Sequence, residues 1–269
     1  MMSLINYLKD IRKKGNRSFT LEQVMQDLNV SKNSALVAIH HLKKQGEIIS
    51  PARGLYVIVP PEYQLQGSIP PEELIPILMK YLNADYYVSL LTAGLFHGAS
   101  HQRPHRFQVI STKRTQHPLE FGYIKIEFIY KKSIAGLPIN DVVVKTGYLK
   151  VATPELTAMD LLLYRSKSGG LNHIATVLAE LVEVIDADKL IKLAHVSDQI
   201  AWVQRLGYIL EKIETMEEKK KKNIIDKLAL YLKNKMTKFV PLAPQLSRTH
   251  FPRSKKWMII ENTTIESDL

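Results

Sequence analysis

Residues 18–59, SFTLEQVMQDLNVSKNSALVAIHHLKKQGEIISPARGLYVIV, decide the fold of the first part of the chain. Thr20 is a favourable helix N-cap, and the apolar residues after it follow the spacing of one helical face: Leu21, Val24, Met25 and Leu28. Asn29-Val30 then predicts a tight turn. The stretch therefore begins with a short amphipathic helix that another element follows closely.

Ser31 caps a second predicted helix, and Gly46 ends it as the residue after the C-cap. At about 100° per residue, one stripe of this helix is apolar and faces the core: Ala35, Ala38, Ile39 and Leu42. The opposite stripe carries an amide, an apolar surface, an imidazole and an ammonium group: Asn33, Val37, His40 and Lys44. Such groups suit the hydrogen-bonding and methyl pattern of the DNA major groove.

Beyond Gly46, Ile48-Ile49 and residues 55–59 predict a β-hairpin with Arg53 near its tip, which completes the winged helix-turn-helix pattern. We predict DNA contacts from the second helix and the wing: Ser31, Lys32, Asn33, Ser34, Val37, His40, His41, Lys43, Lys44 and Arg53. One alternative is a winged helix used only for protein contact. Leu36 and Val37 can touch thymine methyl groups or mark a dimer or domain contact.

The composition is that of a globular protein with a basic surplus. The 269 residues include 37 Lys and Arg against 26 Asp and Glu, a net charge of +11. This surplus favours duplex DNA as the partner, and a charge that serves only solubility is the alternative. The absence of cysteine excludes disulfides, thiolate catalysis and Cys-ligated zinc. We expect a cytoplasmic protein with no signal peptide, transmembrane helix or membrane partner.

Shifts in composition divide the chain into predicted domains. Residues 1–59 form the winged helix-turn-helix domain, which starts with a helix over residues 3–14. Residues 60–71 hold four prolines and a glycine and predict a linker. Residues 72–269 form the C-terminal domain, with a sheet-containing part at 72–152, a helical part at 153–236 and a basic tail at 237–269.

In the sheet-containing part, residues 86–98 predict a buried helix, and later runs predict strands: residues 107–111, 123–130, 142–146 and 148–152. Thr153-Pro154-Glu155 opens the helical part, whose later helices are expected at residues 171–185, 188–196, 198–218 and 223–236. The predicted fold class is α+β. An N-terminal winged helix-turn-helix precedes a mixed α/β C-terminal domain with a small antiparallel sheet and a C-terminal helical tract.

Three stretches of the C-terminal domain carry recognisable motifs. Residues 86–111 include Leu95-Phe96-His97-Gly98, residues 148–164 include Val151-Ala152-Thr153-Pro154-Glu155 with Asp160, and residues 205–213 read RLGYILEKI. In this order, behind a winged helix, they resemble the AbiEi family, the antitoxins of bacterial type IV toxin–antitoxin systems. The resemblance spans about residues 3–236.

The resemblance implies an antitoxin with two activities. The winged helix would bind inverted repeats in its own promoter and repress the operon. The C-terminal domain would counter a nucleotidyltransferase-like toxin without forming a stable complex with it. One rival is a plain transcriptional regulator whose C-terminal domain senses a ligand or only dimerises. The other is a nuclease or transferase with a divergent catalytic site.

No familiar catalytic pattern occurs in the sequence, so we expect no enzyme, no catalytic residue, no metal and no cofactor. Three histidines are spaced by four residues: His97, His101 and His105. Gly98 and Pro104 interrupt a helix there, so we prefer a His97 that bonds backbone at a helix end or packs in the core over a zinc site. Asp160, an acid within an apolar helix, is expected to bond a backbone or basic partner.

A second basic region is the predicted antitoxin surface: Arg103, Arg106, Lys113, Arg114, Lys131 and Lys132. It can bind RNA, further DNA or an acidic partner, or it can be an ordinary basic surface. The alternative surface is in the tail, where basic residues flank Trp257: Arg248, Arg253, Lys255 and Lys256. The lysine run at residues 219–222 predicts only a solvated helix junction.

Overall fold

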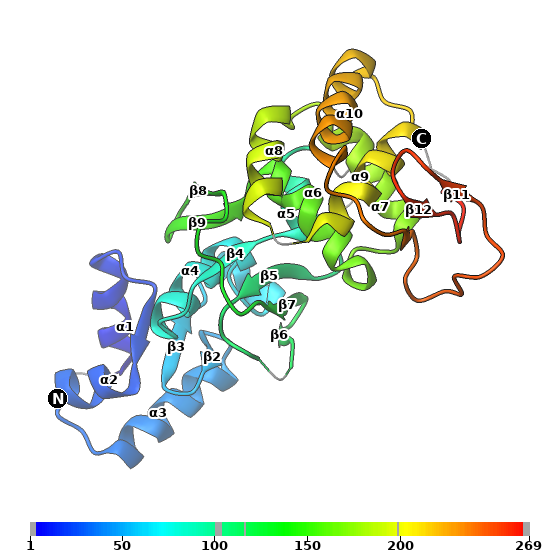
Figure 1. Ribbon diagram of the computed structural model, residues 1–269. Coiled ribbons are helices and arrows are strands. Elements are labelled where there is room, and N and C mark those ends of the chain that lie inside the picture. Colours follow the sequence, from blue (N-terminus) through cyan, green and yellow to red (C-terminus); the bar gives the residue numbers. More distant parts are fainter. Residues whose placement is uncertain (1–3, 100–103, 116, 198, 266–269) are drawn as a thin grey trace. The chain divides into compact units, whose positions relative to one another are not determined.

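The structure, a computed structural model, describes residues 4–99, 104–115, 117–197 and 199–265 (Figure 1). It is a mixed α+β protein with several small sheets. The chain forms two compact units. Unit 1 comprises Met1–Tyr87, His105–Ile134 and Asp141–Lys150, and unit 2 comprises Val88–Pro104, Ala135–Asn140 and Val151–Leu269. This division differs from the predicted boundaries after residues 59 and 71, which stay a prediction.

The head, residues 4–59 of unit 1, consists of three helices and a three-stranded antiparallel sheet. The helices are α1 (Leu4–Lys13), α2 (Leu21–Leu28) and α3 (Lys32–Lys44). The strands are β1 (Ser18–Thr20), β2 (Ile48–Ala52) and β3 (Leu55–Ile58), in the order β1-β3-β2. These are the helix, turn, helix and hairpin that the sequence predicts.

Local signals explain where the head's helices begin and end. Thr20 and Gln23 form a capping box at α2, and Asn29 ends α2 with a left-handed φ of 51°. Ser31 caps α3 by accepting the Ser34 N–H. The stripe predicted to face inward does so, with Ala38 half-buried and the others fully buried: Ala35, Ile39 and Leu42. The helical phase of α3 is therefore confirmed.

Residues 60–71, predicted as a linker, are packed within unit 1. Pro61–Gln66 form the 3-10 helix η1, and Ser68 and Ile69 are fully buried. The Gln66 carbonyl accepts the Tyr123 N–H at 3.2 Å. A Cβ on Gly67 would lie 2.9 Å from the Gly122 Cα, so the two backbones meet without side chains between them. The segment then enters α4 (Pro71–Tyr81), which begins with proline.

The largest sheet has six strands in the order β6-β7-β5-β4-β9-β8. They are β6 (Leu119–Phe121), β7 (Ile124–Tyr130), β5 (Phe107–Ser111), β4 (Tyr86–Val88), β9 (Gly147–Ala152) and β8 (Ile139–Val144). β5 pairs with β7 in parallel, β4 pairs with β9 in parallel, and β6 pairs with β7 antiparallel. The predicted antiparallel sheet is therefore wrong: the sheet is mixed, because side-chain alternation reveals a strand but not the direction of its partner.

The predicted helix over residues 86–98 is also wrong in its first part. Tyr86–Val88 form β4, and the helix α5 covers only Leu90–Phe96. Tyr86, Tyr87 and Val88 are all buried, as expected for a short strand inside a sheet. A short, fully buried strand is continuously apolar, so its sequence cannot be distinguished from a buried helix by periodicity.

Unit 2 contains α5 and a group of helices that lie side by side in Figure 1: α6 (Pro154–Leu163), α7 (Leu171–Leu181), α8 (Ala187–Val196), α9 (Ile200–Lys212) and α10 (Glu218–Leu232). A short 3-10 helix, η2 (Arg165–Lys167), follows α6. The predicted helical tract is confirmed, with ends that differ by a few residues. None of the described helices is long and apolar enough to cross a membrane.

The basic tail is folded onto α9. It forms a three-stranded sheet in the order β10-β12-β11, from β10 (Val240–Pro241), β12 (Ile259–Ile260) and β11 (Arg253–Ser254). Trp257 is fully buried, and its indole ring lies where a Cβ on Gly207 of α9 would be. The indole Nε1 donates to Glu211, one turn further along α9, at 2.6 Å. Glycine at position 207 therefore makes room for the tail.

Gly207→Ala tests this docking. Alanine is the better helix former by about 1 kcal/mol, but its methyl group would overlap the buried Trp257 ring. We expect a net loss of unfolding free energy of about 1–3 kcal/mol, with altered tryptophan fluorescence. The matched control is helical Gly94→Ala, whose Cβ would lie 3.3 Å from the Val177 side chain. Equal melting temperatures for Gly207→Ala and the wild type would contradict the docking.

Candidate nucleic-acid interface

The outward side of α3 is exposed at every position that the sequence assigns to DNA contact: Ser31, Lys32, Asn33, Ser34, Val37, His40, His41, Lys43 and Lys44. The helix has no acid in its first turn, and its last turn carries three of the basic side chains. Val37 is 59% exposed, so its apolar surface has no role in the core of the described head. The arrangement is a polar and basic helical surface with two exposed apolar residues, Leu36 and Val37.

The turn between β2 and β3 carries Arg53, whose side chain is exposed. Two elements hold the backbone of this turn. The Tyr81 hydroxyl at the end of α4 donates to the Arg53 carbonyl at 2.8 Å, and the Leu21 N–H donates to the Gly54 carbonyl at 3.1 Å. Gly54 has a φ of 84°, and a Cβ there would lie 2.9 Å from the Tyr81 hydroxyl oxygen. The turn therefore has a fixed position within unit 1.

The second predicted surface is divided between the two ends of β5. Parallel pairing places Ser111 opposite Tyr130, so the residues that follow β5 and β7 lie at the same end of the sheet, beyond the carboxyl ends of these two strands. We name Lys113, Arg114, Lys131 and Lys132 the carboxyl-end cluster. Arg106 lies at the start of β5, 3.8 Å from the Glu120 carboxylate. Arg103 lies outside the described residues.

Some cations of the carboxyl-end cluster also have local contacts. The Arg114 guanidinium lies 4.4 Å from the centre of the Tyr130 ring, and the Lys131 ammonium donates to the Tyr87 hydroxyl at 3.4 Å. Lys113 and Lys132 are exposed. The latter two are therefore the members best placed to reach a partner.

Other basic residues serve the fold. Lys220 donates to the Glu183 carbonyl, and Lys221 donates to the Ile213 carbonyl at 2.8 Å. These carbonyls lie just beyond the ends of α7 and α9, where cations complement the helix dipole. Of the predicted solvated lysine run, only Lys219 and Lys222 are fully exposed.

The alternative surface in the tail is likewise engaged. Lys256 forms an ion pair with Glu211, and the Arg253 guanidinium lies 5.2 Å from the centre of the Phe239 ring. Trp257 between them is buried and offers no exposed aromatic face. Arg248 and Lys255 are exposed. The tail is therefore a weaker candidate for the antitoxin surface than the carboxyl-end cluster.

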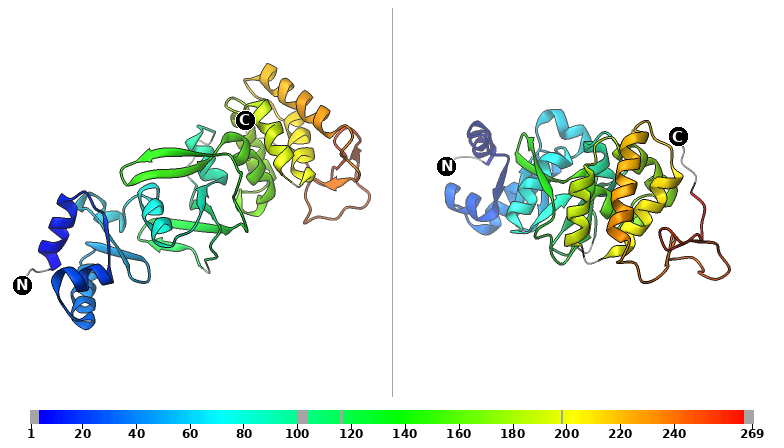
Figure 2. Two further views of the ribbon diagram at one scale, coloured as in Figure 1. Left: turned by 60° about the vertical axis from the view of Figure 1, so that its left-hand side comes forward. Right: turned by 45° about the horizontal axis from the view of Figure 1, so that its top comes forward.

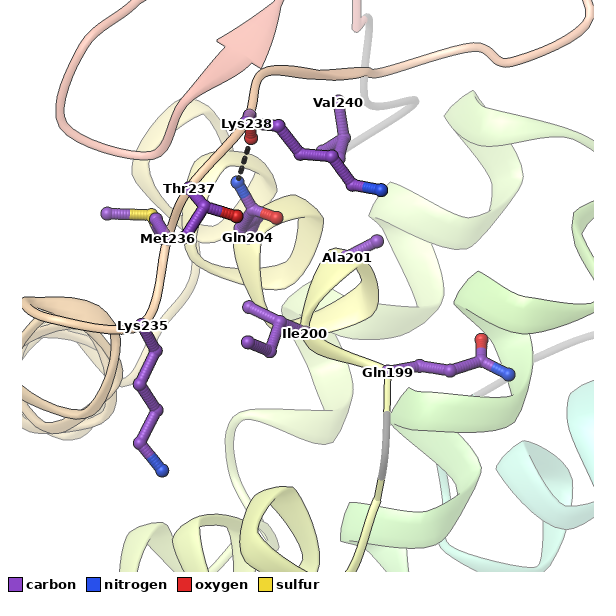
Figure 3. A pocket seen from close by; sticks show the side chains of 9 residues that line it. All are labelled: Gln199, Ile200, Ala201, Gln204, Lys235, Met236, Thr237, Lys238 and Val240. Carbon is purple, nitrogen blue, oxygen red and sulfur yellow. Dashed lines mark hydrogen bonds between the residues drawn. The ribbon is translucent and has the colours of Figure 1, made fainter.

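A pocket of about 330 Å³ lies in unit 2 between the start of α9 and the segment after α10 (Figure 3). Its wall combines apolar Ile200, Met236 and Val240 with the Gln204 amide, whose nitrogen donates to the Lys238 carbonyl at 3.4 Å. No described residue that lines it is acidic or a histidine. The lining therefore lacks the pair of groups that general acid–base chemistry needs.

Two polar groups that the sequence singled out have structural contacts. The His97 imidazole Nε2 lies 2.7 Å from the Ala152 carbonyl, and burial lowers the pKa of His97. The ring is thus a helix-end group bonded to backbone, as predicted. Asp160 is fully buried and accepts a hydrogen bond from the Ser89 hydroxyl at 2.8 Å, a partner that the sequence did not predict. His101 lies outside the described residues. Among the described residues, no cluster of acids and histidines is arranged to hold a metal ion.

Residues 87–212 match the family model of the AbiEi antitoxin C-terminal domain. This segment belongs to that family. The resemblance found in the sequence is confirmed over this range, which covers just under half of the chain and excludes the head. No curated protein matches the sequence.

The fold also has a solved counterpart. The crystal structure of the RV2827C protein from Mycobacterium tuberculosis matches with a TM-score of 0.64 and 16% identity, over 94% of this chain and 89% of that one. The two share a fold. An antigenic nucleotidyltransferase-like protein from Paracoccidioides brasiliensis matches 42% of this chain and 73% of its own, with a TM-score of 0.31 and 10% identity. That score is too low to indicate a common fold.

The motifs of the AbiEi domain have structural explanations. The Thr153 hydroxyl caps α6, and Glu155 in its first turn accepts the Asp186 N–H at 2.8 Å. In the RLGYILE motif, Arg205 donates from Nε to the Pro241 carbonyl at 3.1 Å. Gly207 and Glu211 of the same motif receive Trp257. The third motif therefore anchors the tail, which lies beyond the matched range.

Tyr81→Phe tests whether the held turn matters for DNA contact. The change removes one hydroxyl from a partly exposed ring and frees the Arg53 carbonyl. One such hydrogen bond contributes about 0.5–1.5 kcal/mol, so we expect DNA affinity to fall about 2–10-fold. Fluorescence anisotropy with labelled duplex measures it. Tyr231→Phe, which removes a hydroxyl that donates to the Ala194 carbonyl in unit 2, is the matched control.

A double-mutant cycle gives the sharper result. If Tyr81 acts by placing Arg53, Tyr81→Phe should have no further effect in an Arg53→Ala background. An equal loss in both backgrounds would show that Tyr81 acts on the head in some other way.

Proposed function

We propose that this protein is an antitoxin that also binds duplex DNA through its head, at inverted repeats in its own promoter, and represses its operon. The head acts as a winged helix-turn-helix, with α3 as the recognition helix and the β2–β3 turn as the wing. One observation carries the DNA-binding part: every predicted contact on α3 is exposed, and the helix contains no acid.

The groups divide by chemistry into two kinds of contact. Lys32, Lys43, Lys44 and Arg53 are cations suited to phosphates, which position the protein and supply salt-dependent affinity. Asn33 and His40 can hydrogen-bond base edges, and Val37 can contact a thymine methyl group. Both kinds are needed for a repressor that recognises one operator.

The antitoxin part rests on the AbiEi domain. In this proposal it counters a nucleotidyltransferase-like toxin without forming a stable complex, and the protein catalyses no reaction itself. The carboxyl-end cluster is the working surface. Its four cations lie together at one sheet edge, and an acidic surface or a nucleic acid would be attracted there.

The pocket beside α9 favours a second candidate function, a regulator whose C-terminal part binds a small ligand. The two candidates differ in one cellular result. An antitoxin restores growth when the gene for its toxin is expressed, whereas a ligand-sensing regulator does not.

Four alanine variants test the DNA interface. Lys44→Ala and Arg53→Ala should weaken binding to all sequences and reduce the salt slope by roughly one unit each, since each removes one phosphate contact. Asn33→Ala and His40→Ala should instead reduce the difference in binding free energy between operator and random duplex by about 1–3 kcal/mol. Salt titrations by gel shift measure both effects. Lys192→Ala on the exposed side of α8 is the control, and equal binding by all five variants would reject the assignment of this face.

Charge reversal tests the antitoxin surface. Lys113→Glu with Lys132→Glu changes two exposed members of the carboxyl-end cluster, so the fold should be kept while rescue from the toxin is lost. Growth of cells expressing the toxin and thermal unfolding of the purified protein measure the two properties. The control is Lys219→Glu with Lys222→Glu, which makes the same charge change at exposed positions on α10. Full rescue by the first pair would place the working surface elsewhere.

A further inference from the structure

β8 is the last strand at one edge of the six-stranded sheet, so one side of its backbone faces no other strand of the described chain. It forms a hairpin with β9, drawn in green in Figure 2. Natural edge strands are usually protected by lysine, proline or a bulge. Within Ile139–Val144 the sequence is INDVVV, and Val143 is 78% exposed. This edge thus lacks the first two of these protections, lysine and proline.

The residues from Asp141 to Lys145 read DVVVK, with an acid two residues before Val143 and a base two residues after it. Asp141 and Val143 are exposed and share one face of β8, which ends at Val144, and exposed Lys145 is the first residue of the turn that follows. If two copies of this strand pair antiparallel with Val143 at the centre, residue 141 of one lies opposite residue 145 of the other. Each carboxylate would then face an ammonium group, and each Val143 would face its own copy.

The charges are available for such a contact. Asp141 forms no ion pair with any described residue. The side chain of Lys145 is 61% exposed and lies 3.7 Å from the Glu73 carboxylate, and its ammonium donates to the Tyr63 hydroxyl at 3.1 Å. An ammonium group has three donors, so these contacts hold Lys145 at the end of the strand and leave donors for a second carboxylate.

We propose that β8 is the surface through which two copies of this protein associate. The two strands pair antiparallel about a two-fold axis at Val143 and join two sheets into one. The contact is isologous, because the same residues contribute from both copies, and two-fold symmetry closes the assembly at two copies. The partner is a second copy of this chain because the charge pattern is complementary to itself.

One pair of short strands is a small interface, so the association is weak and depends on concentration. The experiment uses the full chain in sedimentation velocity over a wide concentration range. The wild type should shift from monomer to dimer as concentration rises. Asp141→Lys sets an ammonium group against each Lys145, and Lys145→Asp sets a carboxylate against each Asp141. Like charges then oppose each other in both variants, so each variant alone should stay monomeric.

A mixture of the two variants is the deciding sample. In the proposed antiparallel pair, the introduced lysine of one copy lies opposite the introduced aspartate of the other, and the unchanged Lys145 lies opposite the unchanged Asp141. Both positions again hold one acid and one base, so association should return to about the wild-type level.

Controls separate this effect from a general change of charge or fold. Asp226→Lys, the same charge change at an exposed position on α10, should leave association unchanged. Thermal unfolding checks that each variant is folded.

Val143→Lys provides a test that leaves the Lys145 contacts intact, because it sets two ammonium groups against each other at the axis. It should abolish association. A wild type that stays monomeric at every concentration would overturn the proposal. So would association that survives Asp141→Lys and Val143→Lys, or a mixture that associates no better than its components.

Discussion

The hydrogen bond from Ser89 to Asp160 is the constraint on which the helical part of unit 2 depends. Asp160 is fully buried in α6, the helix against which α5, α7, α8 and α9 pack. A buried carboxylate without partners would cost several kcal/mol, so the segment that presents Ser89 must be placed accurately. Leu90, the next residue, has a φ of 56°, a conformation that leucine rarely adopts. The packing of α6 with Asp160 buried therefore goes together with the sharp turn at Leu90, where α5 begins.

The basic residues of this protein serve two purposes, the fold and the binding of a partner, and the net charge does not show which residues serve which. Arg205 is buried, and burial first, then Arg165 and Arg248, lower the pKa of its guanidinium to about 10. Its hydrogen bonds go to carbonyls, as do those of Lys220 and Lys221. These cations complete the backbone hydrogen bonding of the fold. The cations of α3 and the exposed members of the carboxyl-end cluster are among those that stay exposed for an anionic partner.

The head and the β8 edge give complementary reasons to expect two-fold symmetry. A winged helix reads a short half-site, and recognition of an inverted repeat requires two copies related by a two-fold axis. In the proposed dimer, pairing of two β8 strands about Val143 would supply such an axis. Weak association in solution suits this arrangement, because two adjacent half-sites raise the effective concentration of the second copy.

The sequence by itself determined the head, the helical tract and the AbiEi resemblance. Those features rest on local signals: the caps at Thr20 and Ser31, the helical period through Ile39 and Leu42, and the Thr153-Pro154 helix start. Only the tertiary structure decided the identity of β4, the parallel pairing of β5 with β7, and the burial of Trp257 against Gly207. It also decided which basic residues gather, because that parallel pairing brings the residues after β5 and β7 to the same end of the sheet. The physical reason is that caps and periods are properties of neighbouring residues, whereas strand direction and burial are set by partners far away in the chain.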